Sequence, residues 1–306
     1  MKIKEILMNY FGKRLRDVFE RINEDIFEDT NEIRLRRGRT VIFRGKYGEM
    51  CFDEKGKRTS CDDAIRITGE DIKQMIELMS DYSPYIFKEE IKNGFFTLKG
   101  GFRVGVAGRV VYENGNIAAI KYISGLNIRI AREVKGCCEK IYEKIKGENI
   151  LIISPPNCGK TTLLRDIIRK MSSSGINVGV VDERGEIAGS YMGDEQNDLG
   201  ERTDVLDRCP KVMGMRMLLR SMAPDYIAVD EIGGAEDISS IEEIVNCGVG
   251  MICSIHAADI NELTGKRNIR RMIEDKIFGR YIVLSARGGK GTIEGIYDEK
   301  LKEVRI

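Results

Sequence analysis

Histidine, tryptophan and proline are scarce in this chain, which contains one histidine, no tryptophan and five prolines. A zinc site built from cysteine and histidine has little material here, because such sites need several of these side chains together. The eight cysteines are irregularly spaced and include no C-x-x-C pair. Disulfide frameworks usually accompany regular spacing and an export signal. We therefore expect free thiols in a cytosolic protein.

An excess of positive charge is also missing, since 50 Lys and Arg residues face 49 Asp and Glu residues. General nucleic-acid binders usually carry a basic excess, and aromatic side chains that could stack on bases make up only 7% of the chain. No nucleic acid partner is therefore expected. No apolar run approaches the roughly 18 residues that suggest a membrane span.

The N-terminus places five apolar side chains at helical spacing among charged ones, at Ile3, Ile6, Leu7, Tyr10 and Phe11. It has neither the continuous apolar stretch nor the small-residue cleavage site of a signal peptide. The pattern predicts an amphipathic helix that packs on its own domain. A helix lying on a membrane surface is the less favoured alternative.

The first half of the chain mixes strand and helix patterns. Residues 31–44 alternate apolar side chains with arginines, as a half-buried strand does. A helix is expected after Thr68, and a second short one around residues 86–92. The dipeptide Asn114-Gly115 predicts a hairpin. These patterns indicate an α+β domain over residues 1–135, joined by a helical segment over 133–146 to a second domain over 136–306.

The most informative stretch is residues 149–165, which read NILIISPPNCGKTTLLR. A short apolar run, a turn-rich segment and a helix-spaced run follow one another, as the phosphate-binding motif G-x-x-x-x-G-K-[ST] requires. Ser154 stands where the first glycine is expected, and glycine tolerates backbone angles that serine does not. The motif predicts ATP as ligand, bound by Ser154, Pro155, Pro156, Asn157, Cys158, Gly159, Lys160, Thr161 and Thr162.

The second half alternates strand and helix patterns, which is typical of α/β folds. An apolar strand at 226–229 ends in Asp230 and Glu231. We expect Thr161 and Asp230 to hold Mg²⁺, Lys160 to contact the β- and γ-phosphates, and Glu231 to orient the attacking water. His256 ends the next predicted strand, where a polar residue can sense the γ-phosphate. A purely structural role is the alternative for this histidine.

Three further segments carry a family resemblance: KGGFRVGVAGR (99–109), VVDERGEIAG (180–189) and TDVLDRCPKVMGMRMLLRSMAPDYIAVDEIG (203–233). Together with the 149–165 motif they resemble the stage III sporulation protein AA family of endospore formers. That family is similar to the ring ATPases of type II and type IV secretion and of pilus retraction. The resemblance implies a RecA-like P-loop (Walker A) NTPase domain with a parallel sheet, preceded by a smaller α+β domain. It also implies that Asp182 and Glu183 line the nucleotide site.

The resemblance further implies an ATP-hydrolysing hexamer that energises or assembles a membrane-embedded channel complex during endospore formation. Such a protein is expected in the cytoplasm of the mother cell, peripheral at the membrane complex, with the channel subunits as partners. A neighbouring subunit would supply an arginine to the γ-phosphate. Arg220 is the first candidate, with Arg202 second; the alternative is that Arg220 only interacts with the end of its own helix.

Two other functions stay open. A nucleic-acid-directed RecA-like motor is favoured by the arginine cluster between Arg34 and Arg44. A scaffold that binds ATP for assembly without turnover is favoured by Ser154 alone.

Overall fold

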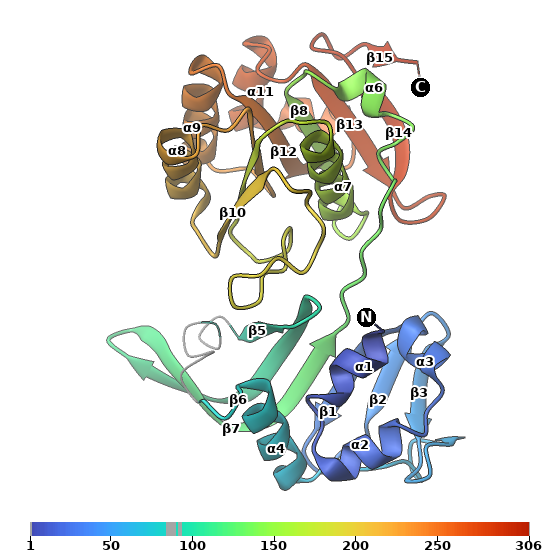
Figure 1. Cartoon of the computed structure of the whole chain (residues 1–306). Helices are drawn as coiled ribbons and strands as arrows, with labels where there is room; N and C mark the ends of the chain where they lie inside the picture. Colours follow the sequence, from blue (N-terminus) through green and yellow to red (C-terminus); the bar gives the residue numbers. More distant parts are fainter. Residues whose placement is uncertain (1, 84–89, 91–93, 306) are drawn as a thin grey trace. The chain divides into compact units, whose positions relative to one another are not determined.

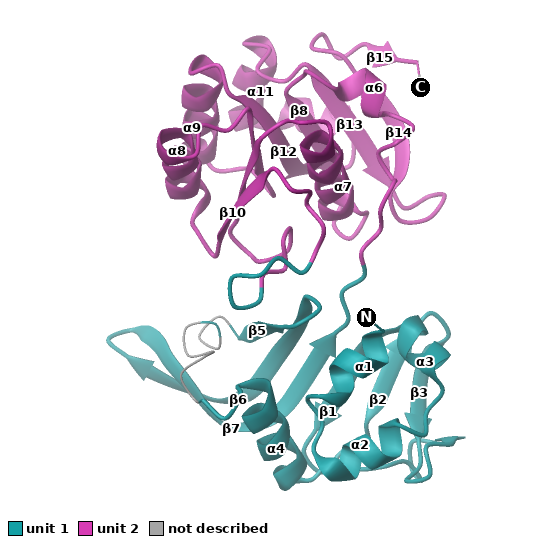
Figure 2. Cartoon of the chain, viewed as in Figure 1, with its two compact units in different colours: residues 1–132, 191–196 teal, residues 133–190, 197–306 magenta. Residues whose placement is uncertain are grey.

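The computed structural model describes residues 2–83, 90 and 94–305 (Figure 1). The chain divides into two compact units (Figure 2). Unit 1 comprises Met1–Arg132 and Tyr191–Gln196, and unit 2 comprises Glu133–Ser190 and Asn197–Ile306. The expected mixed α/β class is confirmed. A boundary between domains at residues 135/136 stays a prediction, and the short helix expected around 86–92 lies outside the described residues.

Unit 1 contains an antiparallel sheet with the strand order β4-β3-β2-β1-β7-β6-β5. The predicted hairpin joins β6 to β7, and its turn residues Asn114 and Gly115 have φ values of 50° and 79°. Left-handed angles at two successive residues are what a tight two-residue hairpin turn needs. The strands are β1 Thr30–Arg36, β2 Ile42–Gly45, β3 Gly48–Phe52, β4 Arg58–Thr59, β5 Phe95–Leu98, β6 Phe102–Glu113 and β7 Asn116–Arg129.

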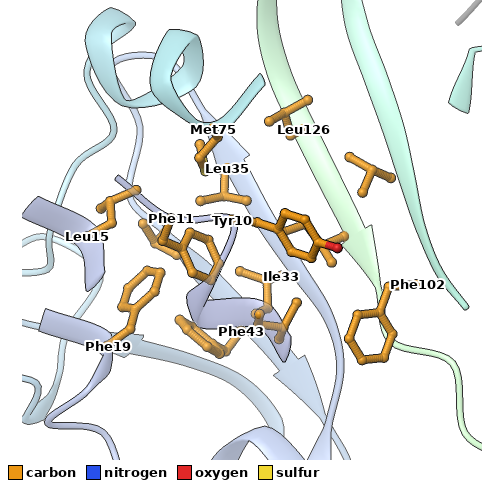
Figure 3. Packing of buried hydrophobic residues seen from close by; sticks show 14 of the residues in the cluster. Tyr10, Phe11, Leu15, Phe19, Ile33, Leu35, Phe43, Met75, Phe102 and Leu126 are labelled. Carbon is orange, nitrogen blue, oxygen red and sulfur yellow. The ribbon is translucent and has the colours of Figure 1, made fainter. Parts of the chain in front are cut away.

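Four helices accompany this sheet in the described part of the chain: α1 Ile3–Met8, α2 Lys13–Phe19, α3 Glu24–Asp29 and α4 Gly69–Met79. The amphipathic N-terminus packs on its own unit, as predicted, because Leu7 and Phe11 are fully buried. Phe11 and Phe43 both meet Phe19 edge-to-face, with ring centroids 4.8 and 5.4 Å from it (Figure 3). Edge-to-face pairs add stabilisation beyond burial itself.

The segment Tyr191–Gln196 belongs to unit 1 by its contacts, although it interrupts unit 2 in the sequence. Tyr191 packs against the unit 1 core and its hydroxyl is hydrogen bonded to Tyr10. The Gln196 side chain accepts a hydrogen bond from the Gly100 amide at 2.7 Å. Burial, together with Tyr191, raises the pKa of Tyr10 to about 12. The sequence predicts only a loop here.

Cys51 in β3 and Cys61 form a disulfide, with Cα atoms 5.6 Å apart. The expectation of free thiols throughout is therefore wrong for this pair. The hairpin of β3 and β4 brings the two residues together, and the spacing of the cysteines gave no sign of it. The other six are free: Cys137, Cys138, Cys158, Cys209, Cys247 and Cys253.

Unit 2 contains a second sheet with the strand order β10-β9-β11-β12-β8-β13-β14-β15. Neighbouring strands run parallel from β10 to β13, whereas β14 and β15 are antiparallel additions at one edge. The sequence of residues 291–305 predicts a hairpin turned at Asp298-Glu299, and this hairpin is confirmed as β14 and β15, with its turn at Asp298. The strands are β8 Ile150–Ser154, β9 Val178–Asp182, β10 Thr203–Asp207, β11 Tyr226–Val229, β12 Gly250–His256, β13 Arg280–Ser285, β14 Thr292–Tyr297 and β15 Glu303–Val304.

The central strand β8 is apolar at every position up to Ser154 because both faces of the sheet are covered. Ile150 and Ile152 pack with α7 on one face, and Leu151 and Ile153 pack with α8, α9 and α11 on the other (Figure 1). This alternation follows from the two-residue period of a strand. The helices are α6 Tyr142–Ile145, α7 Lys160–Ser173, α8 Lys211–Ser221, α9 Ala235–Asn246, α10 Ile260–Gly265 and α11 Arg267–Glu274. Every helix within the described residues is too short or too polar to cross a bilayer.

Two expectations about unit 2 are wrong. The segment 133–146 contains only the short helix α6, because Gly136 has a φ of 81° and the amides of Gly136 and Cys138 bond to a side chain. The stretch 185–207 is rich in glycine and aspartate and predicts a loop, but it ends in a strand, β10, which pairs with β9 at the sheet edge. Its half-exposed side chains lack the apolar run of the neighbouring strand β9.

Asp166 of α7 fixes this irregular segment to the unit. Its buried carboxylate accepts the amides of Gly136 at 2.9 Å and Cys138 at 2.8 Å, and the guanidinium of Arg169 at 2.7 Å. Backbone groups outside regular structure need such partners when they are buried. These hydrogen bonds hold the pKa of Asp166 well below its usual range, against the opposing effect of burial.

We expect Asp166→Asn to lower the free energy of unfolding by roughly 1.5–3 kcal/mol, because an amide nitrogen would face a donor and the charge would be lost. A carboxyl whose pKa is lowered by folding stabilises the protein above its unfolded pKa, and this stabilisation is lost as the pH falls. Urea denaturation should therefore show a weaker pH dependence between about pH 5 and 3 in the variant than in the wild type. The exposed Asp17 provides a matched control, Asp17→Asn. Equal losses in both variants would contradict this assignment.

Candidate functional site

The loop 154–159 connects β8 to α7. Ser154 ends the strand and is fully buried, and its hydroxyl donates to the Pro155 carbonyl at 2.7 Å. Left-handed backbone angles fall on Asn157 (φ 59°) and Gly159 (φ 96°), whereas Ser154 lies in the strand. Asparagine and glycine tolerate this region best. Serine in place of the first glycine of the motif therefore introduces no left-handed strain.

Lys160 is the first residue of α7 and is buried, with 5% of its surface exposed. Its Nζ lies 2.9 Å from Nδ1 of His256, and Nε2 of His256 lies 2.8 Å from a carboxylate oxygen of Glu231. The other oxygen of Glu231 forms an ion pair with Arg184. Burial lowers the pKa of Lys160, while the nearby Asp230 and Glu231 oppose that effect.

These contacts form a continuous polar row from Lys160 through His256 and Glu231 to Arg184. An ammonium group can only donate, so Nδ1 of His256 accepts and its Nε2 carries the hydrogen that Glu231 accepts. His256 reaches this position because it ends β12 and pairs in register with Ser154 of β8. The sequence placed three of these four residues at strand and helix ends; it gave no sign of Arg184, an exposed residue in a turn.

Asp230 lies next to this row. It accepts the hydroxyl of Thr161 at 2.7 Å, and its second oxygen contacts the hydroxyl of Ser254. The amide of Glu231 donates to the same Ser254 hydroxyl at 2.9 Å. Sequence reasoning missed Ser254, although a polar residue in an otherwise apolar strand, two positions before His256 on the same face, was a usable signal.

Asp182 anchors the turn that follows β9. Its buried carboxylate accepts the amides of Glu186, Ile187 and Ala188 at 2.8, 3.0 and 2.8 Å. Burial raises its pKa, and the three amide bonds partly offset that effect. The adjacent Glu183 pairs with Lys211 at 2.9 Å. The Asp182 carboxylate is therefore engaged in shaping the loop that carries Arg184.

Arg220 lies on the outer face of α8, where it lines a largely apolar groove of about 450 Å³ together with Met213, Arg216 and Met217. Among the described residues, no hydrogen bond or ion pair joins Arg220 to the row from Lys160 to Arg184. Arg202 is also exposed, and its amide donates to Ser172 at 2.8 Å. The structure of one chain thus gathers the other predicted site residues but neither arginine.

Thr161 and Asp230 present adjacent oxygen atoms, which suit Mg²⁺. The described residues contain no group of three histidine, cysteine or carboxylate side chains that could hold a metal ion by themselves. Magnesium usually keeps several waters and takes further oxygens from substrate phosphates, so a one-carboxylate site fits this ion.

Comparison with known proteins gives consistent matches over most of the chain. The family model described as "Sporulation stage III, protein AA" matches residues 1–304. Stage III sporulation protein AA of Bacillus subtilis (strain 168) is 44% identical over 241 residues, which are 76% of this chain and 78% of that protein.

Two solved structures are similar in fold. The pilus retraction motor PilT, solved with bound ADP, aligns with a TM-score of 0.58 and 17% identity over 92% of this chain and 78% of its own. The ATPase DotB of Legionella pneumophila aligns with a TM-score of 0.54 and 19% identity over 83% of this chain and 72% of its own. At such identities the likeness concerns the fold alone.

Proposed function

Because the chain belongs to the sporulation stage III protein AA family, we propose that it is an Mg²⁺-dependent P-loop ATPase with a RecA-like nucleotide domain. In this proposal it works as a cytoplasmic homo-oligomer, a hexamer, that energises or assembles a membrane channel complex during endospore formation. The observation that carries the ATPase assignment is the polar row from Lys160 to Arg184 beside the Thr161–Asp230 pair.

The residues divide the work by position. The N-terminus of α7 and the amides of loop 154–159 bind the phosphates, which are favoured at a helix N-terminus. Lys160 contacts the β- and γ-phosphate oxygens. Thr161 and Asp230 hold Mg²⁺, which when bound neutralises phosphate charge. Glu231 orients the attacking water, and His256 responds to the γ-phosphate.

The row also relates phosphate binding to Glu231. An arriving phosphate competes with Nδ1 of His256 for the ammonium of Lys160, because both accept the same hydrogens. Once Lys160 donates to phosphate, His256 loses its donor on one side and retains Glu231 on the other. His256 is thereby able to shift, and with it the carboxylate that it holds.

Unit 1 contributes an arginine-rich hollow of about 510 Å³, whose lining includes Arg34, Arg36, Arg37 and Arg39. Arg34 is paired with Glu32 at 2.8 Å, while Arg36, Arg37 and Arg39 are exposed. Guanidinium groups match phosphate geometry well. In the proposed ring this hollow faces the nucleotide of a neighbouring subunit.

The same hollow favours a second candidate function, a nucleic-acid-directed motor. That function predicts single-strand binding that weakens steeply as the salt concentration rises. The scaffold alternative rests on Ser154 alone, a residue that lies in a strand and carries no left-handed strain.

The proposed function is tested by measuring phosphate release from the oligomeric full-length chain with Mg²⁺ and with a chelator. Mg²⁺-dependent release supports the ATPase. A preparation that binds ATP and is oligomeric but releases no phosphate contradicts the motor and revives the scaffold.

We expect Arg220 to act on a neighbouring subunit's nucleotide, since the γ-phosphate needs an arginine in the transition state. Mixing Arg220→Ala subunits into the wild type should lower turnover by more than their fraction. Adding Lys160→Ala subunits, which keep Arg220, should then restore some activity to the Arg220→Ala sites.

The matched control for this mixing experiment is Arg216→Ala, one turn earlier on α8, where the arginine pairs with Glu243 at 3.0 Å. Its subunits should leave turnover per subunit at the wild-type value at every mixing ratio. A strictly linear loss with Arg220→Ala, without rescue and in a preparation shown to be oligomeric, would leave Arg220 as a local helix residue.

A further inference from the structure

The loop 286–291 between β13 and β14 reads A-R-G-G-K-G and lies against the loop 154–159. It carries two exposed cations, Arg287 and Lys290, and three glycines. This loop is part of neither the 149–165 motif nor the polar row from Lys160 to Arg184.

Two contacts join this loop to the phosphate-binding motif. The amide of Gly291 donates to the carbonyl of Cys158 at 2.9 Å. A Cβ atom placed on Gly159 would lie 3.2 Å from both the Cα and the amide nitrogen of Gly291. Glycine at position 159 therefore permits the close approach, and both Gly159 and Gly291 have left-handed φ angles, 96° and 84°.

The hydrogen bond from Gly291 matters for anion binding. A backbone carbonyl is the negative end of the peptide dipole and repels phosphate, whereas amide N–H groups attract it. Because Gly291 holds the Cys158 carbonyl, that oxygen is turned towards the loop 286–291. The loop thus helps to keep the motif in a form that presents its donors.

The charges on the loop differ in their surroundings. Arg287 lies 4.0 Å from the carboxylate of Glu294, which also contacts the Ser285 hydroxyl. For Lys290, no carboxylate of the described residues lies within ion-pair distance. Its carbonyl carbon lies 3.9 Å from the Cβ position of Gly159, and its ammonium is carried on a flexible four-carbon stem. Lys290 is therefore an exposed, uncompensated cation beside the motif.

We propose that Lys290 is a second phosphate-binding cation of the nucleotide site, supplied by the loop 286–291 of the same chain. This inference rests on the proposed function, because it requires a nucleotide on the loop 154–159. Lys160 is buried, whereas Lys290 is exposed to solvent. Nucleotide binding then recruits Lys290 to the phosphate chain and orders the β13–β14 loop.

The test is nucleotide binding to the full-length chain, measured by calorimetry with ATP, ADP and adenosine as separate probes. Lys290→Ala should weaken ATP binding roughly tenfold, in line with one hydrogen bond to a charged group. Lys290→Arg should retain most of the affinity. Adenosine binding should be the same in all variants, because it lacks phosphate. The difference in ATP affinity should shrink at high salt, since Lys290 is exposed.

Lys300→Ala is the matched control, because it removes the same charge from an exposed lysine beyond the other end of β14. Wild-type ATP affinity in Lys290→Ala would overturn the inference while leaving the proposed function intact. An equal loss in Lys300→Ala would also overturn it, by reducing the effect to net charge. A wild-type chain that binds no ATP would refute the proposed function, and the inference with it. Thermal melting of each variant checks that the fold is retained.

Discussion

Lys160→Ala is expected to weaken ATP binding by about 100-fold or more, because the phosphates lose the buried ammonium at the start of α7. Hydrogen bonds to charged groups contribute roughly 1.5–3 kcal/mol each, and in the proposed function Lys160 donates several to the phosphates. Equilibrium binding of a fluorescent ATP analogue to the full-length chain measures the effect. Removal of Lys160 also leaves Nδ1 of His256 without its donor, so thermal melting must accompany the measurement.

Lys170→Ala is the control for this variant. Lys170 is in the same helix and pairs with Glu139 at 3.0 Å, so its removal makes the same change in charge away from the motif. Unchanged ATP affinity in Lys160→Ala would mean that the loop 154–159 is not the nucleotide site.

Glu231→Gln is expected to keep ATP affinity near the wild-type value and to slow hydrolysis by roughly two orders of magnitude or more. Glutamine keeps an oxygen that can accept from Nε2 of His256, but it loses the charge that pairs with Arg184 and that, in the proposed function, orients the attacking water. Phosphate release at saturating ATP measures the hydrolysis rate, and equilibrium binding of ATP measures the affinity.

Glu236→Gln, at an exposed glutamate in the first turn of α9, controls for the loss of one negative charge. Hydrolysis at the normal rate in Glu231→Gln would direct attention to the acidic pair after β9. Glu183 would then be tested first, because Asp182 is already held by three amides. A Glu231→Gln protein that holds ATP is also the form in which to capture a membrane partner.

The placement of Lys160, Thr161, Asp230 and His256 could be predicted because it depends on patterns within short stretches of sequence. A buried strand, a turn and an apolar-periodic helix place Lys160 and Thr161 at a helix start. Two further apolar strands end at Asp230 and at His256, and parallel strands bring their carboxyl ends to one edge of a sheet. These rules need no knowledge of how distant residues pack.

The remaining features depend on contacts between residues far apart in the sequence. Arg184, which forms an ion pair with Glu231, lies in the turn that the Asp182 carboxylate holds through the Glu186 amide. The segment 133–146 has helical spacing, but the buried Asp166 carboxylate competes for its amides and prevents a continuous helix. In the loop 154–159 the left-handed angles fall on Asn157 and Gly159. The mismatch between Ser154 and the first glycine of the motif does not show this, because residue types alone do not give backbone angles.

The position of Tyr191–Gln196 has a consequence for biosynthesis. Residues up to Arg132 leave the ribosome first, yet unit 1 is complete only when Gln196 has followed. At ordinary rates of translation this interval lasts roughly 3–13 s. Until then the Tyr10 hydroxyl lacks its tyrosine partner and the Gly100 amide lacks its acceptor. Strands β8 and β9 of unit 2 have been synthesised by that time, so part of unit 2 is available for folding before unit 1 is complete.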